Sequence, residues 1–221
     1  FLRQYPHICR NKCILELGAG AALPSLVALA LGAEKVVITD YPNERLLDNI
    51  KKMVIKNNFK LEQQAFVREH EWGTNVRECL DLSKDGLGFD LVLICESFWS
   101  ATYKLHGQLL TSIYNFLSIN GVAIVSFSHH ITEDHPPERD LEFFQLAMVG
   151  GFLVEVYKDP NDNKSKSFQS EGYQQDKVHI FLLKKRPLNI QNQQQHAMHL
   201  RTYASLDFLK SYNASDYDDL V

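Results

Sequence analysis

Apolar runs alternate with stretches of helical periodicity along most of this 221-residue chain. The apolar runs are short and nearly continuous, and they predict buried strands. They cover residues 12–17, 35–40, 64–70, 89–96, 121–128, 152–158 and 177–184. Longer segments between them repeat apolar residues every three or four positions, which is typical of amphipathic helices. Their apolar faces comprise Leu46, Leu47, Ile50 and Val54; Leu105, Leu109, Ile113 and Leu117; and Leu141, Phe144 and Met148. Because buried strands joined by crossover helices form a parallel sheet with helices on both faces, we expect an α/β fold.

The connection before the last strand differs from the others. Residues 159–176 are polar and have no helical period, so the last two strands are expected to pair as an antiparallel hairpin. The sequence therefore predicts a seven-stranded sheet in which five parallel strands are followed by a C-terminal antiparallel hairpin. A short helix is expected near residues 74–80, and the third main helix is expected to begin after Pro136 and Pro137.

The chain ends in a segment of different composition. Residues 187–221 are polar, rich in Gln and Asn, and end in an acidic run. We expect a domain of residues 1–186 followed by this polar extension, part of which can dock as a short helix through its few apolar residues. Because the chain starts at Phe1 and not at a methionine, we also expect residues of the natural N-terminus to precede it.

Composition and charge narrow the class of protein. With 45% hydrophobic residues, the chain can bury one sizeable core. The net charge is −4 and no block of Lys and Arg stands out, so nucleic-acid binding is not expected and a basic protein partner fits better. No apolar run is long enough to cross a bilayer, and no signal peptide is visible. Four dispersed cysteines without a CxxC pair indicate reduced thiols and no metal site. We expect a cytoplasmic protein, and a monomer because no long exposed apolar face requires a partner subunit.

A glycine-containing turn follows the first strand, within the segment ELGAGAALPSL at residues 16–26. Gly18 and Gly20 allow close backbone approach, and Pro24 favours the first turn of a helix. Strand, glycine turn and helix together are the way in which an α/β sheet holds a nucleotide-like ligand. Leu23 stands where a dinucleotide-binding turn has its third glycine, and no Gly-Lys-Ser/Thr follows, so neither a dinucleotide nor a P-loop site is expected.

Two acidic residues accompany this turn. Glu16 precedes it and Asp40 ends the next predicted strand, which suits a ligand with ribose hydroxyls and a positive charge. The pattern resembles motif I of the class I S-adenosylmethionine methyltransferases, whose third small residue is Ala22 here. The resemblance implies a Rossmann-like sheet in the order 3-2-1-4-5-7-6 and S-adenosylmethionine as cofactor. It also implies that the turn runs under the methionine moiety and that Asp40 accepts both ribose hydroxyls.

The third predicted strand ends in His70-Glu71-Trp72-Gly73. Trp72 offers a flat apolar face suited to an adenine ring, although a core position is the alternative for such a residue. The resemblance further implies that Cys95 presents its backbone to the adenosine. The cofactor-binding residues expected from the sequence and the resemblance together are Glu16, Gly18, Ala19, Gly20, Asp40, Tyr41, Trp72 and Cys95.

An acidic and an aromatic residue follow the fourth strand, at Glu96 and Trp99. They resemble the Asp/Glu-x-x-Tyr/Phe element of the seven-strand methyltransferases that modify lysine in non-histone proteins, with tryptophan in place of Tyr or Phe. This resemblance covers about residues 10–185. From the chemistry of methyl transfer to a protonated amine, we assign Glu96 to hold the incoming ammonium of the substrate and Trp99 to pack against its methylene stem or its cationic head. Glu96 and Trp99 are therefore the expected catalytic residues.

The run at residues 139–144 resembles the fungal elongation-factor methyltransferases, a group once described as nicotinamide N-methyltransferase-like. These enzymes modify the N-terminal glycine and a nearby lysine of elongation factor 1-alpha, and the resemblance implies that this factor is the substrate. Two alternatives stay open: a small-molecule N-methyltransferase of the nicotinamide type, and a non-catalytic module that binds the cofactor. His129 and His130, after the fifth strand, line a substrate channel or are ordinary loop histidines, and they complete no metal-ligand set.

Overall fold

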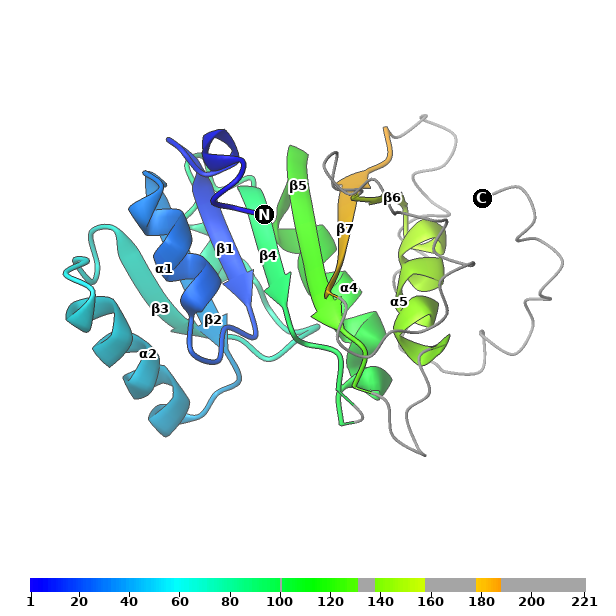
Figure 1. The fold of residues 1–221 in the computed structure, drawn as a ribbon, viewed down its shortest axis with the longest axis horizontal. Helices are drawn as coiled ribbons and strands as arrows, with labels where there is room; N and C mark the ends of the chain where they lie inside the picture. Colours follow the sequence, from blue (N-terminus) through cyan, green and yellow to red (C-terminus); the bar gives the residue numbers. More distant parts are fainter. Residues whose placement is uncertain (100, 131–137, 158–177, 188–221) are drawn as a thin grey trace, which may run out of the picture. The chain divides into compact units, whose positions relative to one another are not determined.

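The structure, a computed structural model, describes residues 1–99, 101–130, 138–157 and 178–187. Within these residues, strands form one seven-stranded sheet in the order β3-β2-β1-β4-β5-β7-β6 (Figure 1). The strands are β1 (Cys13–Leu17), β2 (Lys35–Asp40), β3 (Ala65–Glu69), β4 (Phe89–Cys95), β5 (Leu117–Ser128), β6 (Phe152–Val156) and β7 (Val178–Lys185). Neighbours from β3 to β5 are parallel, whereas β7 pairs antiparallel with both β5 and β6. The predicted fold class, sheet order and antiparallel strand pair are confirmed.

Helices cover both faces of this sheet. In Figure 1, α1 (Leu23–Ala30) and α2 (Glu44–Lys56) lie in front of the strands, and α4 (His106–Phe116) lies behind them. The helix α5 (Glu138–Val149) packs against α4 and β6. The short elements are α3 (Arg77–Leu80), which confirms the predicted short helix, and the 3-10 helices η1 (Pro6–Ile8) and η2 (Tyr103–Leu105). The connection 159–176, Pro136 and Pro137, and the extension beyond residue 187 lie outside the described residues.

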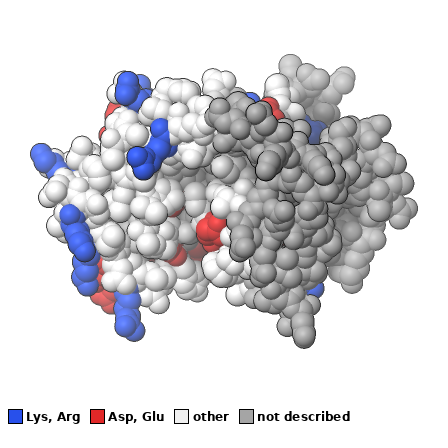
Figure 2. Space-filling view, viewed as in Figure 1, with Lys and Arg blue, Asp and Glu red and all other residues white. Residues whose placement is uncertain are grey.

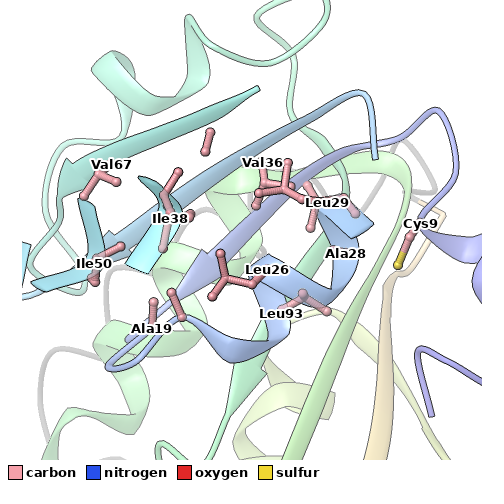
Figure 3. Close-up of a cluster of buried hydrophobic side chains, with 14 of the residues drawn as sticks. Cys9, Ala19, Leu26, Ala28, Leu29, Val36, Ile38, Ile50, Val67 and Leu93 are labelled. Atoms are coloured by element: carbon pink, nitrogen blue, oxygen red, sulfur yellow. The ribbon is translucent and has the colours of Figure 1, made fainter. Parts of the chain in front are cut away.

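The front face of the sheet packs on α1 and α2 through a cluster of buried aliphatic side chains (Figure 3). The cluster includes Leu26 and Leu29 of α1, Ile50 of α2, and Val36 and Ile38 of β2. All five residues of β1 are buried. Burial on both sides explains why the parallel strands appear in the sequence as continuous apolar runs rather than as alternating patterns.

Several predicted strand boundaries differ from the structure by a residue or more, and two of them have a clear local reason. The fifth strand begins at Leu117 and not at residue 121, because Leu117 leaves the helix and pairs with Phe89 before a shift in register. Gly121 lies so close to this pair that an added Cβ would meet the Phe89 carbonyl oxygen at 2.6 Å. The fourth strand ends at Cys95, because Glu96 adopts a left-handed backbone conformation with φ +52°.

The parallel strands β1 to β4 end at Leu17, Asp40, Glu69 and Cys95. Since parallel strands run in one direction, these ends share one edge of the sheet, and the loops that follow them gather there. The edge beside neighbouring strand ends is where open α/β sheets hold their ligands. Among the described residues, no helix is long and apolar enough to cross a membrane.

Candidate functional site

A cavity of about 400 Å³ opens at the carboxyl edge of the parallel strands. Its volume lies within the range of small-molecule sites, about 300–1,000 Å³. The lining residues come from the loops after β1, β2, β3 and β4 and from the start of α4. They are Gly18, Asp40, Tyr41, His70, Glu71, Trp72, Glu96, Ser97, Trp99, Thr102, Leu105 and Gln108.

The turn after β1 brings the backbone to the cavity wall. Gly18 has φ +65°, and an added Cβ would lie 3.1 Å from Cζ2 of Trp72 and 3.2 Å from Oγ of Ser97. Gly20 has φ +52°, but its added Cβ would meet nothing within 4 Å. Ala22 is also left-handed, with φ +57°, where it caps α1. This turn therefore needs small residues for two reasons, its backbone conformation and the closeness of Trp72.

Gly18→Ala and Gly20→Ala form a matched pair that separates these two causes. Both substitutions place an alanine in left-handed backbone, which costs roughly 1–2 kcal/mol. Only Gly18→Ala also forces Trp72 to move, so we expect it to lower the free energy of unfolding clearly more than Gly20→Ala does. Urea denaturation of the two variants measures this difference. Equal losses would show that Trp72 does not pack on Gly18.

Asp40, at the end of β2, holds its carboxylate beside this turn. Its Oδ2 accepts a hydrogen bond from the Gly20 N–H at 2.7 Å, and its Oδ1 accepts one from the Tyr41 N–H at 2.7 Å. These bonds fix the carboxylate, and each oxygen keeps a second lone pair for a further donor. The Tyr41 side chain is exposed and lines the cavity beside it. The arrangement suits a ligand that offers two neighbouring hydroxyl groups.

Glu16, the first acid of the motif, lies beneath the turn and not in the cavity wall. Its side chain is buried, and its Oε2 accepts hydrogen bonds from the N–H and the hydroxyl of Ser25 in the first turn of α1. Burial raises the pKa of the Glu16 carboxyl to about 8. The hydrogen bonds from Ser25 lower this pKa, but their effect is smaller than that of burial. The structure thus gives Glu16 the local role of joining β1 to the start of α1.

The raised pKa of Glu16 predicts a pH-dependent stability. Between its ordinary pKa of about 4.3 and the folded value of about 8, the unfolded chain releases this proton while the folded chain keeps it. Rising pH therefore favours unfolding across this window, by on the order of 5 kcal/mol in total, and the loss levels off above it. Glu16→Gln removes the titration and keeps an acceptor for Ser25. We expect urea midpoints of the variant to fall less between about pH 5 and pH 8 than those of the wild type; parallel curves would contradict this.

One wall of the cavity rests on a buried polar pair. Nε2 of His70 lies 2.8 Å from Oγ of Ser112, which also accepts the Gly73 N–H at 2.8 Å. Burial lowers the pKa of His70 to about 4, so the ring is neutral near pH 7. Gly73 has φ +83°, and an added Cβ would lie 2.9 Å from Cβ of Gln108. The pair and the glycine together hold the loop that carries Trp72 against α4.

The loop after β4 separates inward from outward side chains. Phe98 is fully buried and packs its ring against Phe127, Phe143 and His106, with ring centroids 4.7–5.0 Å apart for the closest three contacts. Glu96 sits in left-handed backbone with φ +52°, a conformation that costs of order 1–3 kcal/mol for a residue with a Cβ. The buried Phe98 anchors the loop in this conformation and leaves the Glu96 side chain at the cavity.

Glu96 is the centre of a small polar cluster. Its Oε2 accepts a hydrogen bond from the Ser128 hydroxyl at 3.0 Å and lies 3.1 Å from Nε2 of His130. The indole N–H of Trp99 donates to the Glu96 carbonyl oxygen at 2.6 Å, and the Trp99 ring stacks on that of His130 with centroids 3.8 Å apart. A carboxylate beside an aromatic wall is an arrangement that binds cations.

Six of the ten residues expected from the sequence line one cavity. These are Gly18, Asp40, Tyr41, Trp72, Glu96 and Trp99. The other four are not among the lining residues: Glu16 and Ala19 are buried, Cys95 is half-buried at the end of β4, and Gly20 is exposed and donates its N–H to Asp40. Burial raises the pKa of the Cys95 thiol to about 12, so it stays protonated.

Sequence reasoning missed several residues that the fold brings to the site. His70 and Glu71 belong to the quoted strand end, but they carried no assigned role, and Ser97, Thr102, Leu105 and Gln108 lie in loop and helix positions without a motif. The sequence is compatible with two positions for His130, a substrate channel or an ordinary loop. The structure places it on Trp99 and Glu96, next to the cavity. Its position directly after a strand that ends at the same edge was the available signal.

The charge distribution around the site favours a cationic ligand. Figure 2 shows a small exposed acidic area near the centre of the viewed face, close to where β4 ends in Figure 1, while most of the visible Lys and Arg side chains lie toward the left border of the molecule. Within the described residues, no group of three or more His, Cys, Asp or Glu is arranged to hold a metal ion.

Known proteins resemble this chain at three levels. A family model described as lysine methyltransferase matches residues 4–148. "Protein N-terminal and lysine N-methyltransferase EFM7" of Candida glabrata is 37% identical over 158 residues, covering 70% of this chain and 59% of the relative. The Schizosaccharomyces pombe protein of the same name is 34% identical over 159 residues, covering 70% and 60%. The chain thus spans about three fifths of the length of these relatives. A solved TehB-like SAM-dependent methyltransferase from Corynebacterium glutamicum shares the fold, with a TM-score of 0.53, 18% identity, and coverage of 80% and 82%.

Proposed function

This chain belongs to the lysine methyltransferase family, and we propose that it is an S-adenosylmethionine-dependent N-methyltransferase that acts on amines of a protein. The observation that carries the proposal is the single cavity in which Asp40 and Trp72 lie together with Glu96 and Trp99. One half of this cavity suits a nucleoside, and the other half suits a cationic amine. The names of the two fungal relatives, which specify N-terminal and lysine N-methylation, support the same reaction.

The residues at the glycine turn fit the cofactor. Gly20 has open space where a Cβ would stand, so backbone can approach a ligand there. The Asp40 carboxylate can accept the two ribose hydroxyls through its remaining lone pairs, and the Trp72 ring offers an apolar face for adenine. When bound, S-adenosylmethionine supplies an electrophilic methyl group on a sulfonium with a neutral thioether as leaving group. The chain itself therefore mainly has to align the nucleophile, and such positioning can supply on the order of 7–11 kcal/mol.

Glu96 and Trp99 are the catalytic residues in this proposal. A target lysine is mostly protonated near neutral pH, and freeing its lone pair at about pH 7.4 costs roughly 4 kcal/mol. An N-terminal amine costs under about 1 kcal/mol by the same arithmetic. The Glu96 carboxylate holds the incoming ammonium, and the Trp99 ring packs against its methylene stem. Because both residues border the cavity with Asp40, they hold the amine at the end of the cofactor site.

We infer further that the substrate is elongation factor 1-alpha, that the reaction takes place in the cytoplasm, and that the protein acts as a monomer. The resemblance at residues 139–144 supports the first point, and the acidic area near the site supports a basic segment as the target. A protein substrate also requires an open site, and Trp99 at the cavity is 46% exposed.

Labelling with tritiated S-adenosylmethionine tests this proposal. The full 221-residue chain is added to a cell lysate, and proteins and small molecules are separated before counting. We expect one main labelled protein of the size of elongation factor 1-alpha, with the label in its N-terminal region or on lysine. Label in nicotinamide or a similar small amine would favour the small-molecule alternative. Absence of any transfer, together with calorimetric binding of S-adenosylhomocysteine, would identify a non-catalytic module.

A further inference from the structure

The two oxygens of the Glu96 carboxylate have different surroundings. Oε2 accepts a hydrogen bond from the Ser128 hydroxyl at 3.0 Å and lies 3.1 Å from Nε2 of His130. Among the residues that the structure describes, none donates a hydrogen bond to Oε1. The Glu96 side chain is 43% exposed and lines the cavity, so a ligand can reach this carboxylate. Oε1 is the oxygen that is left for the ligand.

His130 is directed at Oε2 by its own surroundings. An ionised carboxylate only accepts hydrogen bonds, so Nε2 of His130 carries a proton in this contact, whether the ring is neutral or charged. The ring stacks on that of Trp99, with centroids 3.8 Å apart and an angle of 14° between the planes. The side chain of the preceding His129 is fully buried, and its Nδ1 lies 2.7 Å from Oδ2 of Asp140. The His130 N–H is therefore a donor of fixed direction.

Ser128 comes from a strand that is paired on both sides. Near its carboxyl end, β5 pairs with β4 at Ser126 and Cys95 and with β7 at Ser128 and Val178. A side chain on such a strand is held more precisely than one on a loop. The Ser128 hydroxyl thus approaches the Glu96 carboxylate from a rigid part of the sheet.

The backbone of Glu96 is fixed at both of its polar groups. Its N–H donates to the Ser126 carbonyl oxygen at 2.8 Å, and its carbonyl oxygen accepts the indole N–H of Trp99 at 2.6 Å. The remaining freedom of the residue lies in its side-chain torsions, of which a glutamate has several. The two donors on Oε2 restrict these torsions. Backbone and side chain together then present Oε1 in one orientation.

We propose that Ser128 and His130 are positioning residues for the methyl transfer, which hold Oε2 of Glu96 so that Oε1 receives the substrate ammonium. The inference rests on the proposed function and deepens it. A carboxylate that turned freely would hold the ammonium in many places, whereas one fixed through Oε2 holds it in one place relative to the cofactor. Such alignment of the reacting groups is a large part of what an enzyme supplies. Ser128 and His130 are not among the residues that line the cavity, and they act on the substrate only through Glu96.

Four single variants test the two donors. Ser128→Ala removes the hydroxyl, and His130→Phe removes the N–H but keeps a ring to stack on Trp99. We expect each to lower the rate of methyl transfer about 10-fold, the effect of losing one hydrogen bond to a charged group. Ser128→Thr keeps a hydroxyl and His130→Gln keeps an N–H donor, so both should stay within about 3-fold of the wild type. Ser118→Ala, at the other end of β5, and His7→Phe, in η1, are the controls and should match the wild type.

Combination with Glu96→Gln shows whether the two residues act through Glu96. The amide at this position no longer attracts the ammonium, so its orientation has little further effect on the rate. We expect Ser128→Ala and His130→Phe to lower the remaining rate of Glu96→Gln by less than about 2-fold, whereas residues that act independently keep their full effect in the double variant. A merely structural role of Ser128 or His130 would give that full additional loss.

The measurement is the initial rate of tritium transfer from S-adenosylmethionine to lysate protein at low lysate concentration, with calorimetry of S-adenosylhomocysteine for every variant. Losses in Ser128→Ala and His130→Phe that the Thr and Gln variants restore and that vanish in the Glu96→Gln background, at unchanged cofactor affinity, support the proposal. Wild-type rates in Ser128→Ala and His130→Phe, no recovery in the Thr and Gln variants, full losses in the double variants, or loss of cofactor binding overturn it and leave the proposed function intact. Absence of transfer by the wild-type chain overturns the proposed function, and the inference with it.

Discussion

Replacing Glu96 with glutamine is expected to lower the methyl-transfer rate by about 10²–10³-fold while cofactor binding stays within a few-fold of the wild type. The amide has the same shape and can still accept hydrogen bonds from Ser128 and His130 at the Oε2 position. It lacks the negative charge that holds a substrate ammonium in place in the proposed mechanism. The initial rate of tritium transfer and the calorimetric affinity for S-adenosylhomocysteine measure the two effects separately.

The control for this variant is Glu155→Gln. Glu155 is an exposed residue of β6 that pairs with Lys184 of β7, outside the cavity. The Glu155→Gln substitution changes the net charge of the protein by the same amount as Glu96→Gln and should leave the transfer rate unchanged. A Glu96→Gln variant with wild-type turnover would show that Glu96 has no part in the mechanism. It would also show that a negative charge at this position is not needed to hold the substrate ammonium.

Replacing Asp40 with alanine is expected to weaken the binding of S-adenosylhomocysteine by roughly 10²–10⁴-fold. Two hydrogen bonds from ribose hydroxyls to a charged acceptor would be lost, each contributing about 1.5–3 kcal/mol. The substitution also removes the bonds that Asp40 accepts from the Gly20 and Tyr41 N–H groups. Asp40→Asn keeps one carbonyl oxygen as an acceptor, so it should weaken binding less than alanine does.

Asp48→Asn provides the matched control for Asp40. Asp48 lies on α2, where it pairs with Lys51 and is about half exposed. Its substitution should leave the dissociation constant unchanged in the same calorimetric titration. If Asp40→Ala bound S-adenosylhomocysteine as tightly as this control, the ribose would not be held at the end of β2.

The fold could be predicted from the sequence because its strands are buried on both faces. In β1 and β4 the apolar residues are nearly continuous, interrupted only by Glu16 and Asp90, and the crossover helices between parallel strands leave clear periodic faces. The start of β5 could not be predicted, because Leu117 leaves the helix only through its pairing with Phe89 on another strand. Such a boundary is set by tertiary contact and leaves no local pattern.

The site could be predicted only in part, for a similar reason. Asp40 and Glu96 follow strands, and strand ends at one edge of a parallel sheet meet. Glu16 belongs to a strand with both faces covered, so no sequence pattern indicates that its carboxylate is directed under α1 toward Ser25. The contact between His130 and Glu96 joins residues 34 positions apart. No sequence pattern encodes it without the structure.

The most direct test of the central claim is a crystal structure of this chain with S-adenosylhomocysteine. We expect the nucleoside at the carboxyl edge of the sheet, with both ribose hydroxyls about 3 Å or less from the Asp40 carboxylate. Its sulfur should face the side of the cavity formed by Glu96 and Trp99. A nucleoside bound elsewhere on the protein, or an Asp40 side chain directed away from the ribose, would contradict the account.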